Sequence, residues 1–191
     1  PGPSKAKEKW PSVTVGQVKS PEDAVLADLD ADGNMDVVSC CEGQTKTIYF
    51  HWAPKDRTQL MNPDAWKTEA LPASEGAMMW MFCAPAELDR ENTVDLVAGG
   101  KGEGAQLGWF ESPQNPRDVA AWKWHPMREV GWIMTIRLLD LDEDGDRDIL
   151  ASDRKGSKRG VFWLRNPSPG ALQTKPWNEI FIGGSDREVM F

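Results

Sequence analysis

Short apolar runs separated by polar turns follow one another along this chain in a fixed order. Two acidic stretches are each followed by an apolar run, at 37–40 and 149–151, and then by a polar turn that contains glycine. An aromatic run ending at proline comes next, and it recurs at 49–54, 108–113 and 162–167. Runs this short, rich in β-branched and aromatic residues and bounded by turn residues, predict β-strands.

Tryptophan opens the next run in each case and gives the period of a repeat. Trp10, Trp66, Trp122 and Trp177 lie 56, 56 and 55 residues apart. Units of roughly 50 residues with four short strands are typical of the blades of a β-propeller. The sequence therefore predicts an all-β fold, with a single β-propeller region over 1–191 built from four-stranded antiparallel blades.

The pattern accommodates about three complete blades and two single strands. The repeat units are expected at approximately 20–72, 78–129 and 132–184. A leading strand is expected at 9–18 and a trailing strand at 186–191. Because closed propellers have roughly four to eight blades, and because open sheet edges invite aggregation, we expect a partial propeller. The ring would then be completed by the remainder of a longer chain or by a homo-oligomer.

Two nine-residue loops, at 28–36 and 140–148, carry the pattern Asp-x-Asp-x-Asp-Gly-x-x-Asp. Carboxylates at alternate positions offer the oxygen ligands of a hard cation such as Ca2+, and the glycine lets the backbone turn sharply. An EF-hand would need glutamate at the twelfth position, which is Ser39 in one loop and Ala151 in the other. The flanking runs are strand-like, so the loops predict calcium sites between strands, with acidic β-turns as the alternative.

A degenerate copy of the loop stands between these two. Its acidic positions are Glu87, Asp89, Glu91 and Asp95, and Asn92 replaces the glycine. Two carboxylates are therefore one methylene longer than in the other loops, and the turn lacks the residue that adopts it most readily. We expect this middle loop to bind calcium weakly or not at all.

The acidic loops and the blade pattern together resemble the FG-GAP/VCBS-type repeat, a calcium-binding propeller repeat of integrin α-subunits and of many bacterial extracytoplasmic proteins. The resemblance implies a seven-bladed ring and calcium that holds together the first two strands of a blade. It also implies that the first, third, fifth and ninth loop residues bind calcium by their side chains and the seventh by its carbonyl. The implied ligands are Asp28, Asp30, Asp32, Asn34, Asp36, Asp140, Asp142, Asp144, Asp146 and Asp148.

Charge and hydropathy favour an extracytoplasmic protein. The formal net charge is −8 and the isoelectric point about 4.8, which argues against a nucleic-acid partner because such binding depends on basic patches. No apolar run approaches the roughly 18 residues of a membrane span, and no signal peptide is visible. Because calcium is abundant outside the cytoplasm, we expect an extracellular or periplasmic location.

The chain has three cysteines, Cys40, Cys41 and Cys83. An odd number leaves at least one thiol unpaired unless it pairs between chains. Cys83 lies in the unit next to that of the other two. A disulfide from Cys83 to Cys40 or Cys41 therefore stands beside the alternative of buried free thiols.

Candidate ligand-binding residues lie in the variable loops opposite the acidic ones. Trp80 and Trp132 could each stack on a sugar ring near the central axis, with Arg137 as a polar neighbour. The alternative is that both tryptophans begin strands and pack between blades. The basic turn at 154–159 could bind an acidic polysaccharide or could simply be solvated.

Catalytic signatures are scarce. His51 and His125 are the two histidines, and both lie on outer strands of their units, away from a central site. Hydrolase, zinc-protease, phosphate-loop and dinucleotide motifs do not occur. The sequence thus favours a binding module for glycans or an extracellular protein partner. The alternative is the propeller part of a sugar- or polysaccharide-modifying enzyme, of lyase or dehydratase type, with its active site at the ring centre.

Overall fold

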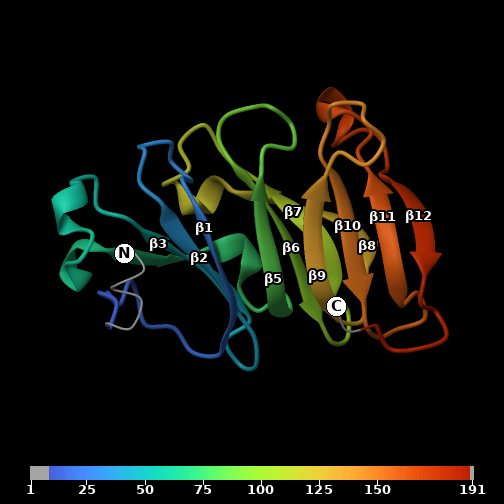
Figure 1. The fold of residues 1–191 in the computed structure, drawn as a ribbon, viewed down its shortest axis with the longest axis horizontal. Coiled ribbons are helices and arrows are strands. Elements are labelled where there is room, and N and C mark those ends of the chain that lie inside the picture. Colours follow the sequence, from blue (N-terminus) through green and yellow to red (C-terminus); the bar gives the residue numbers. More distant parts are fainter. Residues whose placement is uncertain (1–8, 190–191) are drawn as a thin grey trace.

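The computed structural model describes residues 9–189, which form three four-stranded antiparallel sheets and no α-helix. We call these sheet 1 (β1–β4), sheet 2 (β5–β8) and sheet 3 (β9–β12). They stand next to one another in chain order across Figure 1. The all-β class and the four-stranded antiparallel units predicted from the sequence are confirmed. The described residues do not form a closed ring.

Strand order within every sheet follows the chain, so each sheet is a run of hairpins. Sheet 1 contains β1 (Pro21–Ala27), β2 (Asp36–Cys41), β3 (Thr47–Trp52) and β4 (Lys67–Ala70). Sheet 2 contains β5 (Met79–Ala86), β6 (Asp95–Lys101), β7 (Gln106–Glu111) and β8 (Lys123–Glu129). Sheet 3 contains β9 (Ile133–Leu139), β10 (Asp148–Asp153), β11 (Gly160–Arg165) and β12 (Asn178–Gly183). Short 3-10 segments lie in the connections at Arg57–Gln59, Pro63–Ala65, Pro72–Ser74, Val119–Ala121 and Pro169–Ala171.

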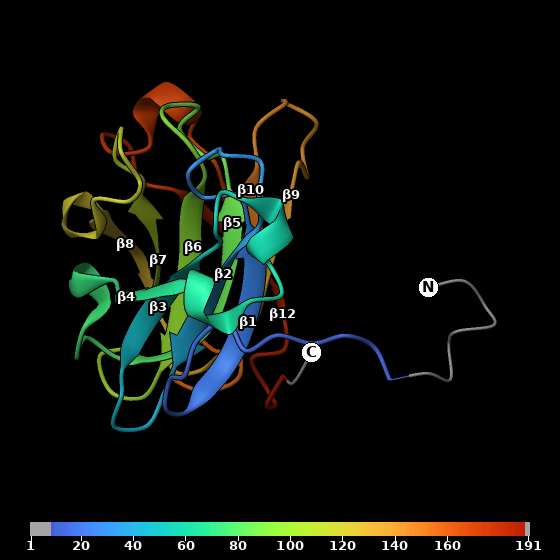
Figure 2. The ribbon, with the colours of Figure 1, turned by 90° about the vertical axis from the view of Figure 1, so that its left-hand side faces the viewer.

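The expected leading strand at 9–18 does not form, and that prediction is wrong. The segment was expected to be the fourth strand of a blade, and such a strand pairs with a third strand. In all three sheets of the described residues the third strand already pairs with the fourth strand of its own sheet, so no third strand is left for this segment. Figure 2 shows it as an extended chain beside sheet 1. The expected trailing strand is likewise not formed as far as residue 189, and its last residues, 190 and 191, lie outside the described part.

The three sheets share one hydrophobic core, with β5 lying between β1 and β9. Trp80 on β5 contacts Phe110 at 5.5 Å and Trp124 at 5.3 Å between ring centroids. Phe50 of sheet 1 meets Trp122, which precedes β8, at 5.0 Å. Aromatic rings therefore fill the space within and between sheets, where they contribute much of the packing energy.

The outward face of sheet 3 is less buried than the corresponding faces of sheets 1 and 2. Trp163 occupies the register position of Phe50 in sheet 1 and Trp109 in sheet 2, which are 0% and 1% exposed. Trp163 and its cross-strand neighbours Leu150 and Ile180 are only half-buried. A position that is fully buried in sheets 1 and 2 is therefore only half-buried in sheet 3, within residues 9–189.

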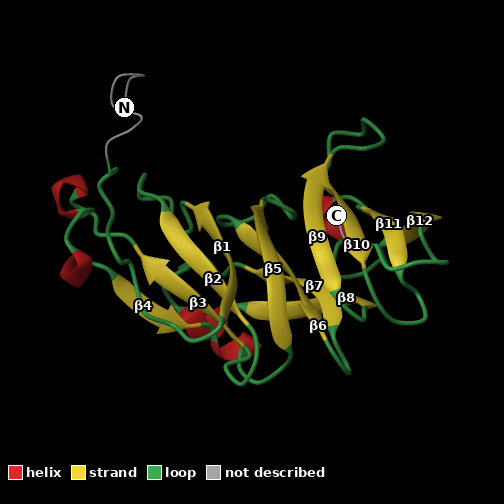
Figure 3. Cartoon of the chain, turned by 60° about the horizontal axis from the view of Figure 1, so that its bottom comes forward, coloured by secondary structure: helices red, strands yellow, loops and turns green. Residues whose placement is uncertain are grey.

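The three acidic stretches connect the first and second strands of each sheet and lie along the upper edge of Figure 1. Figure 3 shows loops at both ends of the strands, with the sheets forming the middle of the molecule. The fold thus places three equivalent loops on one face.

All three cysteines are buried and free. Burial raises the pKa of the Cys41 thiol to about 11 and that of Cys40 well above its usual value, with Cys83 beside Cys40 adding to the shift. The alternative of buried free thiols therefore describes this structure, and burial keeps the Cys40 and Cys41 thiols protonated.

Candidate functional site

All three acidic loops share one backbone conformation. The fourth and sixth residues of each loop have positive φ, as in Ala31 (56°) and Gly33 (88°) of the first loop. In the middle loop these positions are Arg90 (62°) and Asn92 (52°). Asparagine is among the residues that tolerate this left-handed region best. The middle loop therefore keeps its shape although it has lost the glycine.

The first aspartate of each intact loop shapes the turn. Asp28 accepts hydrogen bonds from the backbone N–H groups of Asp32 and Gly33, both at 3.0 Å. Asp140 accepts the equivalent bonds from Asp144 at 3.1 Å and Gly145 at 3.0 Å. These bonds hold each loop in a tight curve around its own carboxylates.

The first, third and fifth side chains of both intact loops converge. In the triads Asp28, Asp30, Asp32 and Asp140, Asp142, Asp144, one carboxylate oxygen from each residue lies within 4.8 Å of the others. Asp32 Oδ2 and Asp142 Oδ1 are buried and accept no hydrogen bond. A buried carboxylate oxygen without a donor is costly, so this donor set fits a hard cation that binds oxygen. No such triad occurs in the middle loop of the described chain.

The closing aspartate of each loop is held by two backbone hydrogen bonds. Asp36 accepts hydrogen bonds from the backbone N–H groups of Leu29 at 3.1 Å and Ala53 at 2.7 Å, and it lies outside the triad. Asp95 and Asp148 make the equivalent pair of bonds in the other two loops. The ninth residue thus ties the start of its loop to the end of the third strand. This explains why it persists in the middle loop, where the triad does not.

Burial dominates the titration of two closing aspartates. It raises the pKa of Asp36 to about 6 and that of Asp95 to about 7, although the backbone hydrogen bonds act in the opposite direction. Asp95 therefore stays largely protonated in the folded protein at mildly acidic pH, where it would be ionised in an unfolded chain.

This shift predicts a pH-dependent stability that Asp95→Asn should remove. Between its ordinary pKa of 3.8 and about 7, folded Asp95 holds a proton that the unfolded chain has released. The group therefore stabilises the fold below pH 4, and this contribution is lost as the pH rises towards 7. Urea unfolding should show wild-type stability falling relative to D95N by at most about 1.4 kcal/mol per pH unit in this window. A difference between the two proteins that does not change with pH would contradict the prediction.

Arginines placed against the acidic loops are the main feature that sequence reasoning missed. Arg117, from the β7–β8 connection of sheet 2, pairs with Asp30 and lies 3.7 Å from Asp32 Oδ2. Arg165, at the end of β11, pairs with Asp142 and lies 3.5 Å from Asp144 Oδ2. Each triad is thus partly neutralised by one guanidinium. Arg165 could have been found from its hairpin, because the end of β11 lies beside the start of β10.

The seventh loop residues use their side chains for contacts other than the triads. Asn34 donates to the carbonyls of Pro54 and Lys55, both at 3.2 Å, and accepts from Arg57 Nε at 2.8 Å. Asp146 accepts from Arg90 of the middle loop at 2.8 Å. Only the backbone carbonyls of these two positions remain as the ligand atoms that the family resemblance implies.

Trp80 is not a ligand-binding residue, and that prediction is wrong. Its side chain is 0% exposed, and its indole N–H donates to the carbonyl of Ser74 at 2.9 Å. The alternating pattern of β5 could not reveal this, because both faces of a central sheet are covered.

Trp132 is half-buried and lies among cations, apart from Arg137. The side-chain cations of Lys101, Arg154 and Lys155 lie 4.6, 4.7 and 5.0 Å from the ring centroid. Arg137 is exposed in the second half of β9, opposite Leu150. The structure therefore does not bring Trp132 and Arg137 into one site.

Both histidines make structural contacts. His51 is buried between the hydroxyls of Ser39 and Thr68, each at 2.9 Å, and burial lowers its pKa. His125 stacks on Trp109 at 4.7 Å and bonds to Glu111 at 2.7 Å. Neither histidine lies beside an acidic triad.

Comparison of this chain with models of protein families, and with curated proteins, gives no match. The resemblance to the FG-GAP/VCBS repeat therefore rests on the loop pattern and the internal repeat alone. Among the described residues, no helix has the length and apolar character needed to cross a bilayer.

Proposed function

We propose that this chain is a calcium-stabilised part of a β-propeller that acts outside the cytoplasm as a binding module for glycans or a protein partner. The observation that carries the proposal is the pair of aspartate triads, each held in a preformed turn between two strands. Bound Ca2+ would cancel the repulsion within each triad and hold the hairpin together. The acidic loops of the FG-GAP/VCBS repeat have this arrangement.

The propeller part of the proposal is supported by the repeated packing of the sheets. The first two strands of sheet 1 contact the first strand of sheet 2, and the first two strands of sheet 2 contact the first strand of sheet 3. The half-buried apolar row on the outer face of sheet 3 includes Trp163, at the register position that is fully buried in sheets 1 and 2. A further sheet of the same kind, from a second copy or from a longer chain, would cover it and continue the ring.

The choice of a binding module over an enzyme is supported by the state of the titratable groups. Both histidines are held in structural contacts, and the closing aspartates have both carboxylate oxygens occupied by backbone donors. The chain's net charge of −8 is reduced when two divalent ions bind, which suits a compartment where calcium is plentiful.

Calcium titration of the purified chain should show two sites. We expect dissociation constants on the order of 10⁻⁴ to 10⁻³ M or somewhat tighter, typical of extracellular modules. Asp142→Asn should remove one site and leave the other, because it takes away the central carboxylate of the third loop. Isothermal calorimetry measures both the number of sites and their affinity.

The middle loop provides a matched control. Asp89→Asn changes the residue equivalent to Asp142 in a loop without a triad, so two sites should remain. No heat at millimolar calcium, or the loss of a site in D89N, would overturn the proposal.

A further inference from the structure

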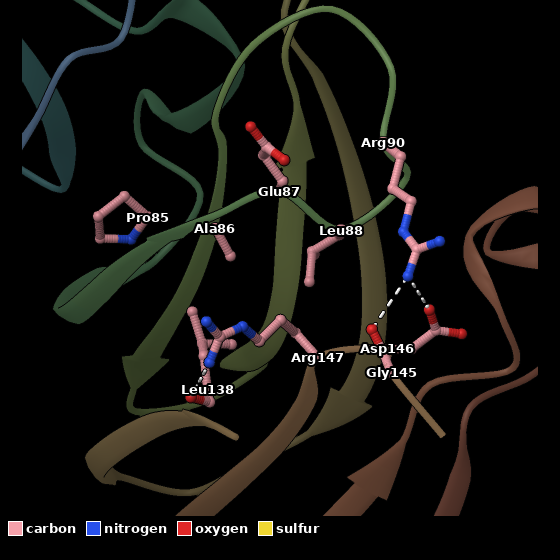
Figure 4. A pocket seen from close by; sticks show the side chains of 9 residues that line it. All are labelled: Pro85, Ala86, Glu87, Leu88, Arg90, Leu138, Gly145, Asp146 and Arg147. Carbon is pink, nitrogen blue, oxygen red and sulfur yellow. Dashed lines mark hydrogen bonds and ion pairs between the residues drawn. The ribbon is translucent and has the colours of Figure 1, made fainter. Parts of the chain in front are cut away.

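A pocket of about 480 Å³ lies between the middle and third acidic loops (Figure 4). It is bordered by the ends of β5 and β9, the first strands of sheets 2 and 3. Pro85, Leu88 and Leu138 give it an apolar floor, and charged side chains stand around this floor. The pocket combines this small apolar area with a larger share of charged and polar groups, and its volume is in the range of small-molecule sites.

Arg90 closes one side of the pocket by joining the two loops. Its guanidinium donates to the carbonyl of Gly145 at 3.0 Å and to Asp146 at 2.8 Å. Arg90 occupies the fourth position of the middle loop, where the first loop has Ala31. The middle loop, which has no triad, therefore contacts the third loop through the Arg90 side chain. This wall of the pocket is specific to the middle and third loops.

The charges of Arg147 and Glu87 are not neutralised by ion pairs with other residues of the pocket. Arg147 donates one long hydrogen bond, of 3.5 Å, to the carbonyl of Leu138. Figure 4 shows its guanidinium beside Leu138, with the Glu87 carboxylate on the opposite side of the pocket. Both side chains are exposed, and Arg147 forms no ion pair within the described residues. A guanidinium with unused donors is well suited to hold a carboxylate through two parallel hydrogen bonds.

We propose that this pocket binds an acidic sugar, with the carboxylate of one uronate unit on Arg147. Glu87 would accept a hydrogen bond from a sugar hydroxyl, and the apolar floor would contact the C–H face of the ring. An additional carboxylate on the ligand would be repelled by Glu87, so one acid group together with hydroxyls is the chemistry that fits. The inference rests on the proposed function as a glycan-binding module and names the class of glycan.

The test is a titration with D-glucuronate, and with D-glucose as the analogue that lacks the carboxylate. Saturation-transfer NMR on the full chain at fixed calcium should give a dissociation constant on the order of 10⁻³ M for glucuronate and much weaker binding of glucose. Arg147→Ala should weaken glucuronate binding roughly tenfold or more, because a charge-assisted pair is lost. Arg187→Ala, which removes an exposed arginine far along the sequence, should leave binding unchanged.

Calcium titration of the same samples separates this inference from the proposed function. The pocket is supported if R147A is folded and still binds two calcium ions but no longer binds glucuronate. Equal binding of glucose and glucuronate, undiminished binding by R147A, or no saturable glucuronate binding by the calcium-loaded wild type would each overturn it. Glucuronate binding that depends on Arg147 in a chain that binds no calcium would leave the pocket standing and remove the calcium proposal.

Discussion

Replacing Arg128 with methionine is expected to lower the free energy of unfolding by about 3–5 kcal/mol. Arg128 is buried at the end of β8, where it donates to Asp153 at 3.2 Å and to Glu179 at 3.0 Å. Its guanidinium also lies 3.8 Å from the ring centroid of Phe162. Methionine keeps much of the apolar volume but leaves the fully buried Asp153 without a cation.

The loss of stability in R128M should come from buried Asp153, which is left without a cation, and not from the broken pair with exposed Glu179. Glu179→Gln removes the other carboxylate, which has a side chain 35% exposed, and should cost less than about 1 kcal/mol. Combining Arg128→Met with Asp153→Asn should recover part of the loss, because the buried charge then disappears with its partner. Urea unfolding measures all three. An R128M protein within 1 kcal/mol of wild type, roughly the value of a surface pair, would show that Asp153 is not dependent on this arginine.

Trp80→Ala should destabilise the chain by about 3–5 kcal/mol, since it removes a fully buried aromatic ring from the core. The cavity would open between Phe110 and Trp124, whose rings pack against the indole. Trp80→Phe keeps a ring and loses mainly the hydrogen bond to Ser74, so it should cost distinctly less. Thermal or urea unfolding of both variants gives the comparison.

The same pair of variants decides whether Trp80 takes part in sugar binding. Folded W80F should bind D-glucuronate as the wild type does, because the indole does not reach the surface. A variant of unchanged stability that no longer binds the sugar would restore the role that the sequence suggested for this tryptophan.

The sequence was sufficient to predict the hairpins and the convergence of the loop carboxylates, because both depend on residues close together in the chain. Strand pairs such as β1 and β2 are joined by the loop that carries the triad, so spacing alone places Asp28, Asp30 and Asp32 together. The positions of the strands follow from short apolar runs bounded by turn residues.

Contacts between distant segments could not be predicted in this way. Arg117 reaches Asp30 from a different sheet, 87 positions further along the chain. The pocket between the middle and third loops likewise depends on Arg90 meeting Asp146, 56 positions away. The two backbone hydrogen bonds of Asp36 could not be predicted for another reason, because a carboxylate that binds a cation and one that accepts two backbone N–H groups look alike in sequence.

The double hydrogen bond of the closing aspartate has a consequence for how such repeats diverge. Because Asp95 makes both hydrogen bonds in a loop without a triad, the closure of the hairpin does not require converging carboxylates. The hairpin and its loop chemistry are thus open to independent selection. One copy of the repeat can therefore change its loop chemistry while its hairpin keeps the same closure.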